Sequence, residues 1–171
     1  LTVTAEAGIG VAALQSALRA RGQWLSLDPP DAARATLGGV IAANASGPRR
    51  HLYGTARDLL IGVTVVTGDG QVVRGGGKVV KNVAGYDLSR VLCGSFGSLA
   101  VITSATFKLS PITMASRTVV AHSTEPAVLF ELARGIGATG ATPSAIEFAS
   151  APHRLLIRIE STRQAAEQQH D

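Results

Sequence analysis

Five short loops carry the residue types best suited to hold a ligand. They are rich in glycine, proline, serine, threonine and asparagine. Glycines let a backbone N–H approach an anion closely, and the hydroxyl and amide groups add donors and acceptors. Each loop alone is also an ordinary turn, but together they indicate an extended anionic ligand. The loops are Asp28-Pro29-Pro30, Thr36-Leu37-Gly38-Gly39, Asn44-Ala45-Ser46-Gly47-Pro48, Tyr53-Gly54 and Ser95-Phe96-Gly97-Ser98-Leu99.

A second pattern, Gly8-Ile9-Gly10-Val11-Ala12-Ala13, matches the GxGxxA dinucleotide fingerprint, with Asp28 about twenty residues later. Such a turn would hold a pyrophosphate over a helix N-terminus, as in NAD-binding Rossmann domains. The strand before it alternates and ends in Glu6, whereas a first Rossmann strand is apolar on both faces. A plain strand-to-helix turn is therefore the preferred interpretation, with an NAD-binding domain as the alternative.

Other chemistries find little support. Gly77-Lys78 is no phosphate loop, because Val79 stands where Ser or Thr should bind magnesium. We expect no metal site, since the histidines are far apart and lack ligand spacing. Cys93 lies in an apolar run that predicts a buried thiol. No serine occupies a GxSxG elbow. The histidines are His51, His122, His153 and His170.

The composition is that of a folded domain, with 46% hydrophobic and 16% charged residues. The net charge of +4 is scattered, and its densest group is Arg49-Arg50-His51. Since aromatics are only 4%, a nucleic-acid surface is not expected. No apolar run predicts a transmembrane segment. A single cysteine fits a reducing cytosol, so we expect a cytoplasmic protein.

The hydrophobic pattern predicts an α+β fold. Strands are expected at 1–6, 24–27, 59–67, 71–74 and 99–109, and helices at 11–21, 36–43 and 87–93. Gly68-Asp69-Gly70 predicts a hairpin turn, and Leu99, Val101, Ala105, Phe107 and Leu109 are expected on one face of their strand. Residues 44–54 are expected to form a loop.

The pattern of residue types in the sequence changes after Pro111. Strands at 118–121, 145–149 and 155–160 and a helix at 126–135 are predicted, followed by a final helix. The glycine-rich loops stop there, so we predict one domain over 1–113 and the start of a second over 114–171. The chain begins at Leu1 in strand-like sequence, which favours a piece of a longer polypeptide.

The order of the loops resembles the FAD-binding domain of vanillyl-alcohol-oxidase-type (PCMH-type) flavoproteins. The stretch from Gly76 to Arg90, GGKVVKNVAGYDLSR, is similar to the branch that holds the FAD-binding subunits of glycolate oxidases. The resemblance implies that residues 1–113 are the second subdomain of an FAD-binding domain, a mainly antiparallel sheet flanked by helices. Residues 114–171 would begin a partial βαββα cap-like domain. The first FAD-binding subdomain would precede Leu1, so the FAD site is expected to be incomplete in these residues.

The resemblance also implies site residues. Asp28, Pro29, Pro30, Thr36, Gly38 and Gly39 would lie along the flavin and its pyrophosphate. Asn44, Ser46 and Gly47 would continue that wall, Tyr86 would line the cofactor space, and Gly97 and Ile102 would lie near the adenosine. Many relatives have Glu where this chain has Phe96. No catalytic residue can be assigned.

The function implied is that of an FAD-dependent oxidoreductase whose flavin takes a hydride from a 2-hydroxy acid such as glycolate. Sister oxidase and iron–sulfur subunits are expected as partners, and these could bring the protein to the inner membrane. The alternative from another class is a non-catalytic subunit that holds FAD for electron transfer.

Overall fold

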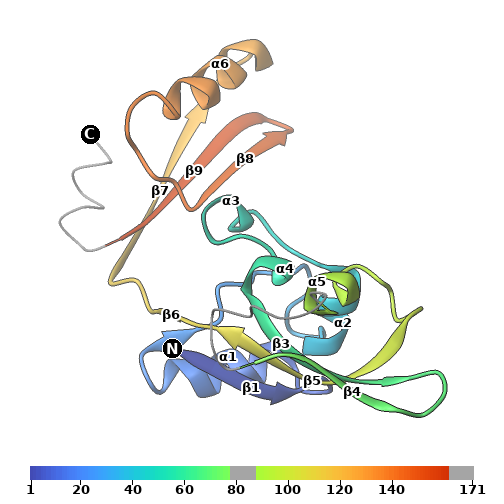
Figure 1. Cartoon of the computed structure of the whole chain (residues 1–171). Coiled ribbons are helices and arrows are strands. Elements are labelled where there is room, and N and C mark those ends of the chain that lie inside the picture. Colours follow the sequence, from blue (N-terminus) through green and yellow to red (C-terminus); the bar gives the residue numbers. More distant parts are fainter. Residues whose placement is uncertain (78–87, 162–171) are drawn as a thin grey trace. The chain divides into compact units, whose positions relative to one another are not determined.

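A computed structural model describes residues 1–77 and 88–161 of the chain. Their contacts divide the chain into two compact units. Unit 1 contains residues 1–47 and 54–112, and unit 2 contains residues 48–53 and those from 113 onward. Both units combine antiparallel strands with helices (Figure 1), as the α+β prediction requires. Within the described part of the chain, no helix is both long enough and apolar enough to cross a membrane.

Unit 1 is built on a four-stranded sheet in the order β1-β5-β3-β4. Every neighbouring pair is antiparallel. A Rossmann domain needs parallel strands joined by crossover helices, so the NAD-binding alternative is wrong for the described residues. The predicted hairpin is confirmed as β3 and β4, and Gly70 takes a positive φ of 83° in its turn. The strands are β1 Thr2–Glu6, β3 Leu60–Thr67, β4 Val72–Gly76 and β5 Ala100–Lys108.

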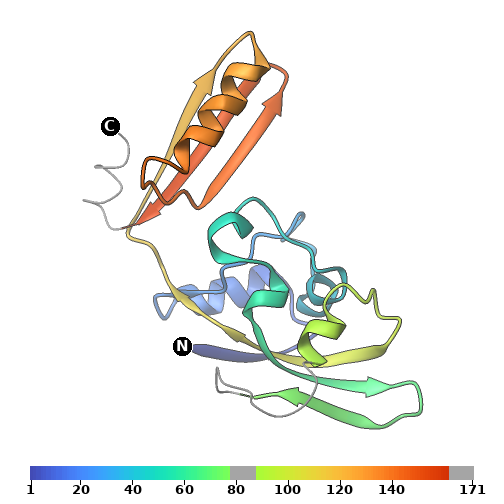
Figure 2. The same ribbon diagram turned by 45° about the horizontal axis from the view of Figure 1, so that its top comes forward.

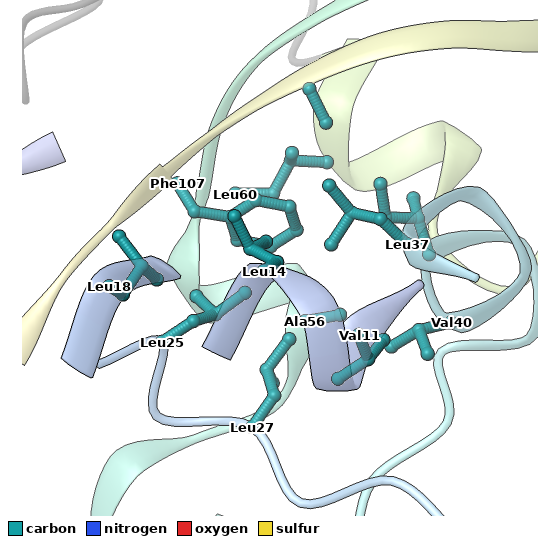
Figure 3. Packing of buried hydrophobic residues seen from close by; sticks show 12 residues of the cluster. Val11, Leu14, Leu18, Leu25, Leu27, Leu37, Val40, Ala56, Leu60 and Phe107 are labelled. Carbon is teal, nitrogen blue, oxygen red and sulfur yellow. The ribbon is translucent and has the colours of Figure 1, made fainter. Parts of the chain in front are cut away.

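Helices α1 (Val11–Arg19) and α2 (Leu37–Ala43) pack on this sheet through apolar residues at helical spacing. Figure 3 shows Leu14 and Leu18 of α1 beside Phe107 of β5, whose side chain has no exposed surface. Burial of a side chain of this size stabilises the fold by roughly 1.5–3 kcal/mol. The same core contains Val11, Leu25, Leu27, Leu37, Val40, Ile41, Ala56 and Leu60.

Strand β5 departs from the predicted alternation. Thr64 pairs with Ser104 but Val65 pairs with Ile102, so Thr103 is an extra residue in the ladder. A bulge of this kind reverses which side chains face the core. Ala105 and Phe107 are buried as predicted, whereas Leu99 and Val101 are 53% and 66% exposed. The prediction of a single apolar face was therefore wrong for the first half of the strand.

The predicted strand at 24–27 is shorter than expected. Only Gln23–Trp24 (β2) pairs with a strand, Ser110–Pro111 (β6). The next residues are bonded by the side chain of Gln15 on α1 instead, which donates to the Leu25 carbonyl at 2.6 Å and accepts from the Leu25 N–H at 3.1 Å. One side-chain amide thus replaces a neighbouring strand for this buried segment.

Three short helices lie between the longer elements of the chain. The predicted loop at 44–54 contains α3 (Arg50–Tyr53), and α4 (Ala56–Leu59) delays the start of β3 by one residue. Helix α4 begins with a capping box, in which Asp58 accepts from the N–H and hydroxyl of Thr55. The predicted helical turn after residue 87 is α5, Leu88–Leu92.

Unit 2 is a three-stranded antiparallel sheet in the order β7-β9-β8, with α6 packed along one face (Figure 2). Leu129 and Ile136 of α6 contact Leu155 and Ile157 of β9 in a separate core. The order β-α-β-β matches the predicted elements, and β7 extends beyond the expected 118–121. The predicted final helix lies outside the described residues. The elements are β7 Ala115–His122, α6 Pro126–Ile136, β8 Ala145–Ser150 and β9 His153–Ser161.

Candidate functional site

The N-terminus of α2 carries the predicted residues Thr36, Gly38 and Gly39. Thr36 is the N-cap, and its hydroxyl oxygen accepts from the Gly39 N–H at 3.2 Å. All four N–H groups of the first turn have acceptors inside the protein, so none of them is left to bind an anion. The acceptors are Ile9 O for Leu37, Ala7 O for Gly38, Thr36 Oγ1 for Gly39 and Thr36 O for Val40.

The two adjacent glycines of this turn have different surroundings. A Cβ at Gly38 would lie 2.9 Å from the Cβ of Ala7 and 3.2 Å from its carbonyl oxygen, so protein packing requires glycine there. A Cβ at Gly39 would meet only the Thr36 hydroxyl oxygen, at 3.1 Å, and Gly39 is exposed. Gly39 therefore presents open backbone to an incoming group.

The loop after α2 packs against the predicted Asp28 segment. The Asp28 carboxylate accepts a hydrogen bond from the Gly47 N–H at 3.1 Å. A Cβ at Gly47 would lie 2.7 Å from Cγ of Asp28, so this approach also requires glycine. Beside the pair, Pro29 is buried, Pro30 is exposed and Ser46 is half-buried. The structure thus brings Asp28 and Gly47 into direct contact.

Asn44 ends α2 in the left-handed conformation, with φ 47°. This geometry suits asparagine, because its short polar side chain can bond locally. Its side-chain oxygen accepts from the Arg57 N–H at 3.4 Å. The amide NH₂ has no partner among the described residues and remains a donor.

The fifth predicted loop is fastened to the same end of α2. The N–H of Gly94 donates to the Ile41 carbonyl at 3.1 Å, and the N–H of Phe96 donates to the Ala42 carbonyl at 2.8 Å. Phe96 takes a positive φ of 52° and is 80% exposed. Gly97, with φ 76°, has nothing within 4 Å of a Cβ position. Like Gly39, Gly97 offers open backbone rather than a packed contact.

Ile102 lies on β5, where its side chain packs against the core of unit 1. The last residue pair between β1 and β5 is Glu6 with Ser104. Ile102 therefore lies past the end of the ladder that these two strands form. Tyr86 lies outside the described residues.

Helix α2 is therefore the common support of the candidate site. Thr36 and Gly39 lie at its N-terminal end, and Asn44 and the loop with Gly97 lie at its C-terminal end. These groups can contact an extended polar ligand through hydroxyls, an amide and open glycine backbone. The described residues hold no group of three His, Cys, Asp or Glu side chains that could bind a metal ion.

A cluster in unit 2 was not predicted. Arg49, part of the basic group noted in the sequence, bonds to the Glu160 carboxylate at 2.6 Å, and Arg158 lies 3.2 Å from the same oxygen. Burial raises the pKa of the nearby Tyr53 phenol, and the Glu160 charge adds to this rise while Arg49 and Arg158 oppose it. Nothing in the sequence pairs residues 49 and 160, which are separated by most of the chain.

Comparisons with a family model and with known proteins agree with the resemblance found in the sequence. Residues 1–76 match the family model described as FAD binding domain. The chain is 44% identical over 117 residues to glycolate oxidase subunit GlcE of Escherichia coli strain K12, covering 68% of this chain and 33% of that protein. It is 35% identical over 157 residues to glycolate oxidase subunit GlcD of Bacillus subtilis strain 168, covering 92% and 33%. The chain thus spans about a third of the length of these relatives.

A solved structure of alkyldihydroxyacetonephosphate synthase has the same fold. The two superpose with a TM-score of 0.80 over 99% of this chain and 36% of the other, at 22% sequence identity.

Proposed function

We propose that the chain is the FAD-binding part of a flavoprotein that oxidises a 2-hydroxy acid, because residues 1–76 match the family model described as FAD binding domain. FAD, predicted as the cofactor from the sequence, is supported by this match and by the relatives. The observation that carries the proposal is the similarity to two glycolate oxidase subunits, at 44% and 35% identity.

The residues around α2 fit a long polar cofactor such as FAD. Gly39 and Gly97 have open space beside their Cα atoms, so a ligand can reach the backbone there. Thr36, Asn44 and Ser46 supply hydroxyl and amide groups. Since the first-turn N–H groups of α2 already have acceptors, we assign the contacts to these side chains and to the two open glycines. Asp28 and Gly47 hold the loop in place.

The roles of FAD and of this chain's residues follow from the chemistry that each can supply. FAD, when bound, accepts the hydride from the carbon that carries the substrate hydroxyl group. The residues of this chain bind and orient the cofactor. We assign no catalytic residue to this chain.

The test is a titration with FAD followed by flavin fluorescence. It should be run on this chain and in parallel on the chain extended toward the length of its relatives. Quenching that saturates, in either form, supports the proposal. If neither form binds FAD, the assignment to a working flavoprotein is refuted.

A non-catalytic role is the second candidate, because the relative at 44% identity is named as a subunit of its oxidase. In that case the chain would hold FAD for electron transfer, with sister oxidase and iron–sulfur subunits in the cytoplasm or at the inner membrane. Turnover of glycolate with an artificial electron acceptor separates the two. Activity of the purified flavin-loaded protein supports the enzyme, and its absence beside an active complex supports the holding subunit.

A further inference from the structure

Phe96 combines two features that are unfavourable for the folded chain by itself. Its φ of 52° lies in the left-handed region, where a bulky side chain is strained. Its ring is also 80% exposed, although a phenylalanine side chain gains stability when it is buried. A single exposed apolar residue is ordinary at a protein surface, but one that is also held in a strained backbone conformation is rare. Strained residues of this kind gather at sites that bind ligands.

The backbone around Phe96 is fixed by hydrogen bonds within unit 1. The Phe96 N–H donates to the carbonyl of Ala42 in the last turn of α2, at 2.8 Å. In the same turn, the N–H and the hydroxyl of Ser98 both donate to the Ser95 carbonyl, at 3.0 and 2.7 Å. The ring is therefore carried by a turn whose conformation the protein itself sets, which favours binding because little order is lost when a ligand arrives.

This turn lies at the end of α2 that belongs to the candidate site. Asn44 ends the helix there, and its Cβ is 3.8 Å from the position that a Cβ on Gly94 would take. Gly97 follows Phe96 directly and has nothing within 4 Å of a Cβ position. Phe96 is thus close to two groups that can contact a ligand, the Asn44 amide and the open backbone of Gly97.

The chemistry of the ring selects the part of a ligand that it can hold. A phenyl ring packs against another flat ring with a separation of roughly 4.5–7 Å between their centres. It has no donor or acceptor for a phosphate or a sugar hydroxyl group. FAD contains two flat rings, the isoalloxazine and the adenine, and either would cover an exposed phenyl ring.

We propose that Phe96 is a cofactor-binding residue, whose ring stacks on one of the two flat rings of FAD. This inference rests on the proposed function and adds to its site a residue that the sequence did not assign to the cofactor. Stacking removes the exposed ring from water, and this gain offsets the strain of the Phe96 backbone.

Substitutions of Phe96 separate stacking from a role in the fold. Phe96→Asn removes the ring and introduces a residue that adopts the left-handed conformation more readily, whereas Phe96→Tyr keeps a ring. Loss of an aromatic side chain that stacks on a base weakens binding by roughly 5- to 150-fold. We expect Phe96→Asn to raise the Kd for FAD within this range, and Phe96→Tyr to keep most of the affinity. Without FAD, Phe96→Asn should have a Tm equal to that of the wild type or higher, because the strain is relieved.

Titration with FMN identifies the ring, since FMN contains isoalloxazine but no adenine. Equal losses of affinity for FMN and FAD in Phe96→Asn assign the contact to isoalloxazine, and a loss for FAD alone assigns it to adenine. Either result supports stacking. The matched control is Val72→Thr, which changes another exposed apolar side chain of unit 1 on β4 and should leave the Kd for FAD unchanged.

Three results overturn the stacking role. They are an unchanged Kd for FAD in Phe96→Asn, a loss of affinity in Phe96→Tyr as large as that in Phe96→Asn, and a lower Tm of Phe96→Asn without FAD. The last would show that contacts within the protein hold the ring. Each of these leaves the proposed function standing, whereas a wild-type protein that binds no FAD refutes the proposed function and the stacking together.

Discussion

Gly39 is the residue at which the proposed contact with FAD can be tested separately from folding. A Cβ there meets only the Thr36 hydroxyl oxygen at 3.1 Å, a contact that a small shift of one side chain relieves. Replacing a helical glycine by alanine gains about 0.5–1 kcal/mol, and valine gains somewhat less. We therefore expect Gly39→Val to change the free energy of unfolding by less than about 1 kcal/mol.

Binding of FAD should respond differently. If the cofactor lies against the open backbone of Gly39, the new side chain must displace it, and overpacking of this size costs about 1–3 kcal/mol. That range corresponds to a loss of affinity of roughly 5- to 150-fold. Flavin fluorescence titration of the FAD-binding form gives the Kd, and thermal unfolding without FAD gives the stability.

Gly38→Ala is the matched control one residue earlier. Its Cβ would lie 2.9 Å from the Cβ of Ala7, so it should lower the stability of the apoprotein by about 1–3 kcal/mol. A folded Gly39→Val protein that binds FAD with unchanged affinity would refute the placement of FAD beside Gly39. A Gly39→Val protein as destabilised as Gly38→Ala would refute the distinction between the two glycines.

Three other substitutions test the loops around the site. Gly47→Ala should lower the free energy of unfolding by about 2–5 kcal/mol, because its Cβ meets Asp28 and the hydrogen bond to that carboxylate is lost; an unchanged Tm would contradict this. The pKa of Asp58 lies below its ordinary value of 3.8 because the Thr55 N–H and hydroxyl bond to the carboxylate. Its contribution is thus present above pH 3.8 and lost as the pH falls through the lowered pKa, so in urea unfolding the stability deficit of Asp58→Asn at pH 7 should shrink at low pH. Phe96→Gly should raise the stability by about 0.5–1 kcal/mol, since the φ of 52° suits glycine and the exposed ring gives up little packing; a lower Tm would show that the ring is held by contacts.

The sequence predicted the elements whose signal is local. Thr36 as a helix cap, the Gly68–Gly70 turn and the helical spacing of Val11, Leu14 and Leu18 all describe neighbours within a few residues, and the structure has each of them. The bulge at Thr103 could not be predicted, because it depends on how two strands align across the sheet.

Long-range partners account for most of the remaining differences. Gln15 replaces a strand for Leu25, and Arg49 meets Glu160 at the far end of the chain. Neither side chain is unusual in its own stretch of sequence, since glutamine is common on a helix and arginine is common in a loop. Only the packed fold gives them their partners.

The glycines of the site show why residue type alone cannot assign a ligand contact. Gly38, Gly39 and Gly47 come from two short glycine-containing loops, and each alone fits the idea of a backbone N–H that approaches an anion. In the structure the N–H of each is bonded within the protein, and at Gly38 and Gly47 a Cβ would strike another residue. Those two glycines are explained by the fold, so no ligand is needed to account for them. In the proposed site, FAD contacts the backbone that packing leaves open, at Gly39 and Gly97, and the side chains beside it. Variants at these two positions therefore test the cofactor site, whereas variants at the other two test the loops that support it.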